Sequence, residues 1–428
     1  GIMSILKDMI ILPLMPWDAL ICTSESVRNT VETIHTDYLE FLELRLGITK
    51  KPKLQLPIIP LGINIDEFSF SDDLTPIKDN YKIDKEDINI IFVGRISFHA
   101  KAHNIPMFLA LEKLSKDIDK NINFIMTGWF PNDAVEKWIK EEGNEICPSI
   151  NLIYVDGRDQ KNKYDIFSIG DIFFSLTDNI QETFGLTPLE AMASGMPVVV
   201  SDWDGYRETV RDGIDGFRIK TTSFPEQLSN TLAYRHDIGA DTYDRYCGYH
   251  SLFTSVDIEE SIEKLKLLIT NDDLRKDLGK NARENAVNNF SWSNVLIKYE
   301  ELSSELNDIR LNEGKEFNII NNKISSDRLS PFKIFSTYPS RIINKDTNLE
   351  KLLNINEISF SKLRDFESIN YASIILPNQK NIDLILTTIN ELEEFTIKKL
   401  IIKSSLDESD IFNIVTLLLK YGYIKIVD

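Results

Sequence analysis

The chain has 428 residues, 42% of them hydrophobic, and a formal net charge of −19 at pH 7. This length predicts two or three domains, because single domains usually hold roughly 100 to 200 residues. The acidic balance argues against nucleic acid as the main partner, since phosphate binding needs a basic face.

Three features of the sequence favour a protein of the reducing cytoplasm. No apolar run approaches the ~18 residues that a membrane helix needs, and no basic segment with a cleavage site indicates a signal peptide. Cys22, Cys147 and Cys247 are odd in number and far apart, which argues against a disulfide framework. We therefore expect a cytoplasmic protein with at most peripheral membrane association.

Strand-like and helix-like segments alternate over the first 300 residues. A strand is predicted at 18–24, a helix at 25–47 and a second strand at 56–62. Val- and Ile-rich strands, mostly followed by helices, are then predicted at 88–95, 122–128, 151–157, 171–176 and 196–202. This alternation predicts parallel βαβ units in a doubly wound α/β sheet. Ligands bind such sheets at the carboxyl ends of the strands, and there lie Gly94, Arg95, Asp156, Gly157 and Glu182.

The segment "QETFGLTPLEAMASGMPVVVSDWDGYRE", residues 181–208, places two acids on either side of a short turn. Thr187 as helix N-cap, with Glu190 three residues later, predicts a capping box. That interpretation leaves Glu182 unexplained. A helix N-terminus attracts phosphate, and carboxylates on both sides of it suit neutral hydroxyls. A nucleotide sugar has this layout, with sugar hydroxyls, a diphosphate and a ribose diol.

The Glu182-x7-Glu190 pattern resembles the donor-site motif of the retaining GT-B glycosyltransferases, specifically glycosyltransferase family four. Further segments follow the order of that family, at 58–68, 92–101, 151–158, 205–217 and 290–302. The resemblance covers residues 17 to about 305 and implies a GT-B fold with a doubly wound donor-binding domain.

The resemblance also implies roles for individual residues. Glu182 would hold hydroxyls of the donor sugar, and Glu190 would bind the ribose hydroxyls. Arg95 and Lys101 would neutralise the leaving diphosphate without a metal or a cofactor, although the family's Lys usually stands one residue closer to the Arg. The other residues implied to line the donor site are Gly94, Asp156, Gly157, Thr183, Phe184, Gly185, Leu186 and Thr187, of which the last two would give N–H groups to the diphosphate.

Several other patterns have competing interpretations. Asp202-Trp203-Asp204 has the D-x-D form of a metal site, but its place after a strand favours a contact of Trp203 with the acceptor or the sugar. His99 and His103 lack an acidic or cysteine partner nearby, so zinc is not expected. The aromatic segment "AYRHDIGADTYDRYCGYH" predicts an insertion packed on the second domain, or else a lid or partner surface.

The composition changes near residue 310. Residues 307–330 are polar and aperiodic and predict a linker. The final "IFNIVTLLLKYGYIKIVD" predicts a helix, a turn at Gly422 and a β-rich tail, typical of a winged-helix unit with its closing hairpin or of a small α/β domain. We predict four regions: 1–60, a remnant of an acceptor-side domain; 61–289, the nucleotide-sugar domain; 290–310, a crossover helix; and 311–428, an accessory domain.

The sequence thus predicts a retaining, metal-independent glycosyltransferase. Its partners would be a nucleotide sugar donor and a glycan, lipid-linked or protein acceptor, in bacterial surface polysaccharide synthesis. The short first region suggests a fragment of a longer protein, or a non-catalytic donor-binding subunit completed by a partner chain or by a second copy. A phosphorylase or an epimerase fits the motif order less well. The sugar, nucleobase and acceptor are not readable from the sequence.

Overall fold

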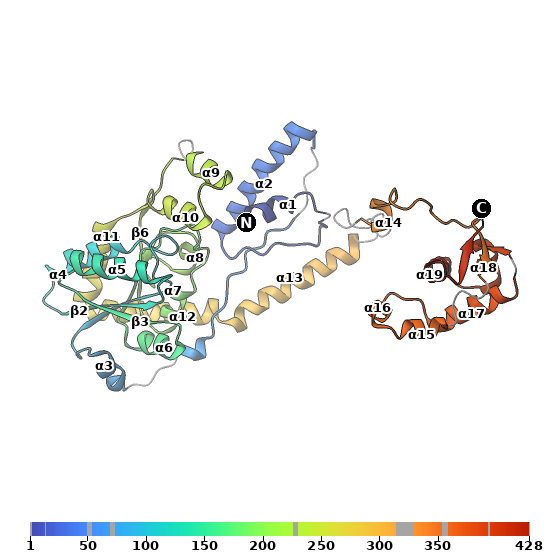
Figure 1. Cartoon of the computed structure of the whole chain (residues 1–428). Helices are drawn as coiled ribbons and strands as arrows, with labels where there is room; N and C mark the ends of the chain where they lie inside the picture. The colour runs from blue at the N-terminus through green and yellow to red at the C-terminus, as the bar shows by residue number, and fades with distance from the viewer. Residues whose placement is uncertain are drawn as a thin grey trace. The chain divides into compact units, whose positions relative to one another are not determined.

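Six short apolar strands pair into one parallel sheet in the order β3-β2-β1-β4-β5-β6 (Figure 1). Its strands are β1 Ile88–Val93, β2 Ile122–Gly128, β3 Asn151–Asp156, β4 Ile172–Ser175, β5 Val198–Ser201 and β6 Gly216–Ile219. The computed structural model describes residues 2–12, 14–48, 54–68, 73–225, 230–313, 329–352, 358–392 and 394–427. The prediction of a doubly wound α/β sheet is confirmed.

Helices cover both faces of this sheet because alternate residues of each strand point to opposite sides. In β1, Ile90 and Phe92 belong to one core and Ile91 and Val93 to the other. The first core is shared with α4 Asn104–Ser115, α5 Asp133–Ile146 and α11 Ile258–Thr270. The second core is shared with α6 Gln160–Ile169, α7 Leu186–Ala193 and α12 Asp272–Phe290.

The order of the strands places a topological switch point between β1 and β4, and the space between the loops after these two strands is called the crevice below. From β1 the chain proceeds outward through β2 and β3, and from β4 it proceeds the other way through β5 and β6. The loops after β1 and β4 therefore diverge at the carboxyl edge of the sheet. Such a switch point is where open α/β sheets bind ligands.

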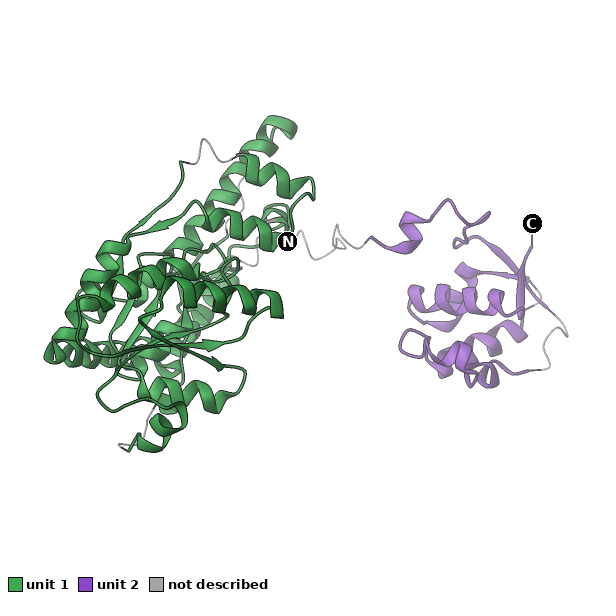
Figure 2. Cartoon of the chain, turned by 60° about the vertical axis from the view of Figure 1, so that its left-hand side comes forward, with its two compact units in different colours: residues 1–318 green, residues 319–428 purple. Residues whose placement is uncertain are grey.

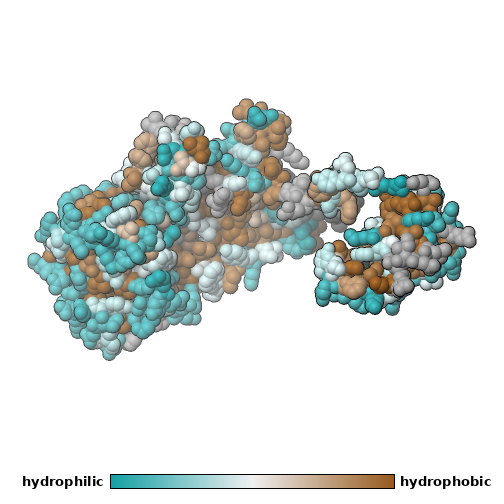
Figure 3. Space-filling view, viewed as in Figure 1, coloured by the Kyte–Doolittle hydropathy of each residue, from teal (hydrophilic) through white to brown (hydrophobic). Residues whose placement is uncertain are grey.

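The N-terminal region contributes helices rather than strands. Its helices are α1 Ile2–Asp8, α2 Glu25–Leu46, the 3-10 helix η1 Ile65–Phe68 and α3 Thr75–Tyr81. The segments predicted as strands at 18–24 and 56–62 lie side by side in parallel, through bridges from Ala19 to Gln55 and from Cys22 to Ile58. Cys22 donates its N–H to the carbonyl of Pro57 at 2.9 Å and accepts one from Ile59 at 3.0 Å, although neither segment is assigned as a strand. Phe41 and Leu44 on α2 are 52% and 88% exposed, and Figure 3 shows hydrophobic residues at the outer end of α2.

The rest of residues 1–318 consists of smaller elements and one long helix. They are α8 Tyr206–Thr209, β7 Thr221–Thr222, α9 Asn230–Asp237, α10 Tyr243–Ser251, β8 Ser255–Val256 and α13 Trp292–Glu313. Helix α13 occupies the segment predicted as a crossover helix and continues into the predicted linker. The remainder of that linker, 314–328, lies outside the described residues.

Residues 319–428 form a second unit with its own core (Figure 2). It contains α14 Pro331–Ile334, β9 Asn348–Lys351, α15 Phe360–Arg364, α16 Glu367–Asn370, α17 Gln379–Asn390, β10 Glu394–Thr396, α18 Ile397–Ser404, α19 Glu408–Lys420 and β11 Ile424–Ile426. The predicted final helix and β tail are α19 and β11. However, β11 pairs antiparallel with the earlier β9 rather than closing a hairpin of its own.

None of the helices in the described ranges has the length and apolar character needed to cross a membrane. The three cysteines are buried and free.

Candidate functional site

The candidate site lies where β1 and β4 end. The loop after β1 carries Gly94, Arg95 and Lys101, and the loop after β4 carries Glu182. Strand pairing between β1 and β4 brings these loops together at one edge of the sheet. Residues that are about 80 positions apart in the sequence thus share one crevice.

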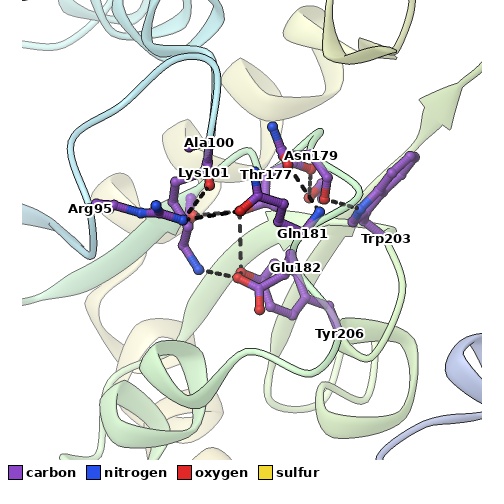
Figure 4. Close-up of polar contacts among 11 residues, drawn as sticks. Arg95, Ala100, Lys101, Thr177, Asn179, Gln181, Glu182, Trp203 and Tyr206 are labelled. Atoms are coloured by element: carbon purple, nitrogen blue, oxygen red, sulfur yellow. Dashed lines mark hydrogen bonds and ion pairs between the residues drawn. The ribbon is translucent and has the colours of Figure 1, made fainter. Parts of the chain in front are cut away.

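Lys101 and Glu182 form an ion pair inside this crevice (Figure 4). The Lys101 Nζ atom contacts Glu182 Oε2, and the two side chains are only 17% and 9% exposed. The hydroxyl of Tyr206 donates a hydrogen bond to the same Oε2 at 3.2 Å. Tyr206 lies inside the family-like segment 205–217, but no role was predicted for it, because 24 residues separate it from Glu182.

Arg95 lies beside the loop that bears Glu182. Its Nη2 donates to the carbonyl oxygen of Ala100 at 3.0 Å and to Oε1 of Gln181 at 3.4 Å (Figure 4). A guanidinium has five N–H donors in a fixed fork, so these two contacts orient the group and leave further donors for an anion. The predicted partners Arg95, Lys101 and Glu182 are therefore brought together.

The turn before α7 depends on Gly185. Its φ is 85°, in the left-handed region, and a Cβ built there would lie 2.0 Å from Cε1 of Tyr206. Only glycine fits this conformation and this gap. Helix α7 begins at Leu186, directly after Gly185 as N-cap, so the N–H groups of Leu186 and Thr187 stand in its first turn without intrahelical partners.

The predicted capping box is wrong. Gly185 rather than Thr187 is the N-cap, and it makes no side-chain capping bond. Thr187 is already helical, and its Oγ1 is buried without a hydrogen-bond partner in the described part of the chain. The positive φ of Gly185 lets the helix start before the threonine. Glu190 therefore takes no part in capping α7.

Glu190 instead forms an ion pair with Lys163 of α6. Its Oε1 lies 2.6 Å from Lys163 Nζ, whereas its Oε2 is buried without a partner among the described residues. Burial raises the pKa of the Glu190 carboxyl, and Lys163 partly opposes that shift. A buried carboxylate oxygen without a donor suits a hydroxyl of a ligand. No sequence motif indicated Lys163.

The adjacent strands β1, β2 and β3 each end at or directly before a glycine, so that a surface of main-chain atoms without side chains lies at this edge of the sheet. Gly94 donates its N–H to the carbonyl of Thr127, and Gly157 donates to the carbonyl of Gly128, both at 2.9 Å. A Cβ on Gly128 would lie 1.7 Å from the carbonyl oxygen of Gly94, and one on Gly157 would lie 2.8 Å from Cα of Gly128. Glycine at 128 and 157 thus lets the ends of β1, β2 and β3 approach closely.

A cavity of about 460 Å³ opens beside this surface, lined by residues that include Trp129, Tyr154, Asp156 and Arg158. Asp156 accepts hydrogen bonds from the Arg158 guanidinium, and those bonds lower the Asp156 pKa to about 2. Asp156 is therefore ionised and already paired in this structure. The hydroxyl of Tyr154 is buried without a partner among the residues described.

The two acids of the D-x-D segment face different partners. Asp202 forms ion pairs with Arg207 at 3.6 Å and Arg218 at 3.4 Å. Asp204 has φ 42° and accepts a hydrogen bond from Ser24 Oγ at 3.0 Å, and burial raises its pKa to about 6. In the described ranges, no cluster of three or more His, Cys, Asp or Glu residues could hold a metal ion.

The predicted insertion packs against the loop of Glu182 through Asn179, which sequence reasoning missed. Asn179 Nδ2 donates to the His99 carbonyl at 3.0 Å and to Ser251 Oγ of α10 at 3.1 Å. Trp203 donates its indole N–H to the carbonyl of Asn179 at 3.1 Å (Figure 4). Helix α10 therefore braces both loops of the crevice. Trp203 is held by this network and contacts the backbone of the Glu182 loop.

Comparisons with known proteins agree with the geometry. Residues 74–235 match the family model of glycosyl transferases group 1. An uncharacterised glycosyltransferase of Methanocaldococcus jannaschii is 27% identical over 254 residues, which cover 59% of this chain and 53% of that protein. Spore coat protein SA of Bacillus subtilis is 22% identical over 217 residues, covering 50% and 48%. The chain thus spans about half the length of these curated relatives.

Among solved structures, a similar chain is Anabaena HepE in complex with UDP and glucose. It has a TM-score of 0.48 and 14% identity, and the match covers 71% of this chain and 67% of that chain.

Proposed function

Because this chain carries a glycosyl transferases group 1 domain at residues 74–235, we propose that it transfers a sugar from a nucleotide diphosphate sugar. The transfer would retain the anomeric configuration and use a glycan, lipid-linked or protein acceptor in the cytoplasm, for bacterial surface polysaccharide. The observation that carries this proposal is the placement of two buried carboxylates, Glu182 and Glu190, on either side of the first turn of α7.

The diphosphate is proposed to lie at that first turn. The amides of Leu186 and Thr187 and the positive end of the helix dipole favour an anion there. Arg95 and Lys101 lie on the facing loop and can share the two phosphates. In the unliganded site the positive charge of Lys101 is balanced by Glu182, so a bound diphosphate would compete for Lys101.

The neutral parts of the donor are proposed to lie on either side of the diphosphate. Glu182 would accept hydrogen bonds from sugar hydroxyls. The buried Oε2 of Glu190 would accept a bond from a ribose hydroxyl, which would satisfy an atom that now lacks a donor. The nucleobase would extend over Gly128 and Gly157 toward the cavity next to Asp156.

The chemical step breaks the bond between the anomeric carbon and the diphosphate oxygen, which keeps the electron pair. The acceptor oxygen forms the new glycosidic bond on the same face, and its proton leaves with the diphosphate. The positive charges of Arg95 and Lys101 would stabilise the negative charge that develops on the departing oxygen. We therefore propose that transfer proceeds without a metal ion.

Calorimetry of the full chain with a panel of nucleotide sugars and their free nucleoside diphosphates tests this proposal. Glu182→Ala should not weaken nucleoside diphosphate binding, because it frees Lys101, and it should weaken nucleotide sugar binding relative to that of the free diphosphate. Glu190→Gln should weaken both ligands. Equal losses for both ligands in both variants would contradict the assignment. A wild-type chain that binds donor but transfers sugar to no acceptor would instead favour a donor-binding subunit.

A further inference from the structure

We propose that Tyr206 is a positioning residue that holds Glu182 through one carboxylate oxygen and so presents the other oxygen, Oε1, to the donor sugar. This inference rests on the proposed function, because it takes Glu182 as the group that binds sugar hydroxyls. The observation behind it is the hydrogen bond of 3.2 Å from the Tyr206 hydroxyl to Oε2 of Glu182 (Figure 4).

Tyr206 is itself firmly held. It is the first residue of α8, its side chain is fully buried, and its ring fills the space next to Gly185. Its hydroxyl lies 3.2 Å from Oγ1 of Thr177, which lies 3.3 Å from Oγ of Ser175. Because a phenol has one O–H donor, the bond to Glu182 uses that proton, and Thr177 can donate to the phenol oxygen. The three hydroxyls form a chain that points at Glu182.

The surroundings keep Tyr206 a neutral donor. Burial, followed by the nearby negative charge of Glu182, raises the pKa of the Tyr206 hydroxyl well above its usual value. The phenol therefore retains the proton that it gives to the carboxylate.

Lys101 and Tyr206 contact the same oxygen, Oε2, and in the described part of the chain no group donates to Oε1. When Lys101 turns toward a bound diphosphate, the Tyr206 hydroxyl becomes the remaining anchor of Glu182. The two donors therefore act differently: Lys101 would leave Glu182 to bind the diphosphate, whereas Tyr206 would keep its hydrogen bond to Glu182 and hold the carboxylate in place for the sugar.

Tyr206→Phe is the test, because it removes only the hydroxyl and keeps the ring next to Gly185. The full-length variant is titrated by calorimetry with UDP, UDP-glucose, UDP-N-acetylglucosamine, GDP and GDP-mannose. Affinity for the free diphosphate should stay within about twofold, while the nucleotide sugar should bind roughly tenfold more weakly, the scale of one hydrogen bond to a charged group. Tyr423→Phe is the control, since its hydroxyl donates to the carbonyl of Ile358 at 2.6 Å and both residues belong to the second unit.

The outcomes separate the inference from the proposed function. If Tyr206→Phe binds the nucleotide sugar as wild type does, or loses equal affinity for both ligands, Tyr206 does not position Glu182. If the wild-type chain binds none of the nucleotide sugars, the proposed function itself is wrong. Should Tyr206→Phe fail to fold, Thr177→Val removes the next hydroxyl in the chain and should give a smaller loss confined to the nucleotide sugar; no loss there would equally overturn the inference.

Discussion

Replacing Gly185 with alanine should destabilise the unit formed by residues 1–318 far more than a typical glycine substitution does. A Cβ at this position would lie 2.0 Å from Cε1 and 2.7 Å from Cδ1 of Tyr206, and real Cβ atoms essentially never approach heavy atoms within 3.0 Å. The Tyr206 ring is fully buried and its hydroxyl is bonded to Glu182, so it cannot simply move aside. Either the ring or the start of α7 must shift.

The expected magnitude has two parts. The left-handed backbone at φ 85° costs a side chain about 1 to 2 kcal/mol. Overpacking against a fixed ring adds about 1 to 3 kcal/mol. Gly185→Ala should therefore lower the free energy of unfolding by about 2 to 5 kcal/mol. Gly195→Ala is a matched control two residues after α7, because its φ is 83° and its Cβ would meet nothing within 4 Å. It should show only the first part.

Urea unfolding followed by tryptophan fluorescence measures this difference. All five tryptophans lie within residues 1–318, so the signal reports on that unit alone. A Gly185→Ala variant no less stable than Gly195→Ala would refute the steric reasoning. Tyr206→Leu provides a second check, since the smaller side chain should make Gly185→Ala less destabilising in a double-mutant cycle.

Three further predictions concern charge and pH. Glu190→Gln should weaken both nucleoside and nucleoside diphosphate binding, roughly tenfold in calorimetry, because one of the two carboxylate acceptors becomes an amide donor and the charge on the other is lost; binding of inorganic diphosphate alone should not change. Arg95→Ala and Lys101→Ala should each weaken nucleoside diphosphate binding while leaving nucleoside affinity within about twofold, since both are proposed to bind the phosphates and not the nucleoside; equal losses for both ligands would contradict the assignment. The folded-state pKa of Asp204, raised to about 6 by burial, means that its contribution to stability is present at low pH and is lost as pH rises from about 4 to about 6. Asp204→Asn should remove that decline in unfolding experiments at each pH, and an unchanged pH profile would show that Asp204 is not the group responsible.

Five of the six strands of the sheet could be predicted because each has its own sequence pattern. Residues 88–93 form an Ile- and Val-rich run, interrupted only by Asn89, with a glycine directly after it, and residues 122–127 and 151–156 are likewise followed by a glycine. Strand β6 was missed, since its four residues lie in a polar, glycine-containing stretch and are recognisable only beside β5. The segments predicted as strands at 18–24 and 56–62 do run side by side in parallel and share main-chain hydrogen bonds, but their pairing is too short for either to be assigned as a strand.

The site was predictable as a set of residues but not as a set of contacts. The spacing of Glu182 and Glu190 indicated their place at a helix start. It did not indicate that Lys101 would pair with Glu182, or that Lys163 would pair with Glu190. Those pairs depend on how β1, α6 and the loop after β4 approach in space. The cap was misjudged because a threonine before a proline is a strong local pattern, whereas the positive φ of Gly185 and its close approach to Tyr206 are visible only in the structure.

The glycines that end β1, β2 and β3 have a consequence for how this protein should be mapped experimentally. Alanine scanning finds functional residues by deleting side-chain atoms, and Gly94, Gly128 and Gly157 have none to delete. A scan that skips glycines would therefore not test whether these three positions contribute to ligand binding. Adding a methyl group is the informative change there: at Gly128 it would collide with the main chain of Gly94, and no rotamer change could relieve the collision. The part of the proposed site with the least room for a side chain is thus the part that side-chain deletion does not probe.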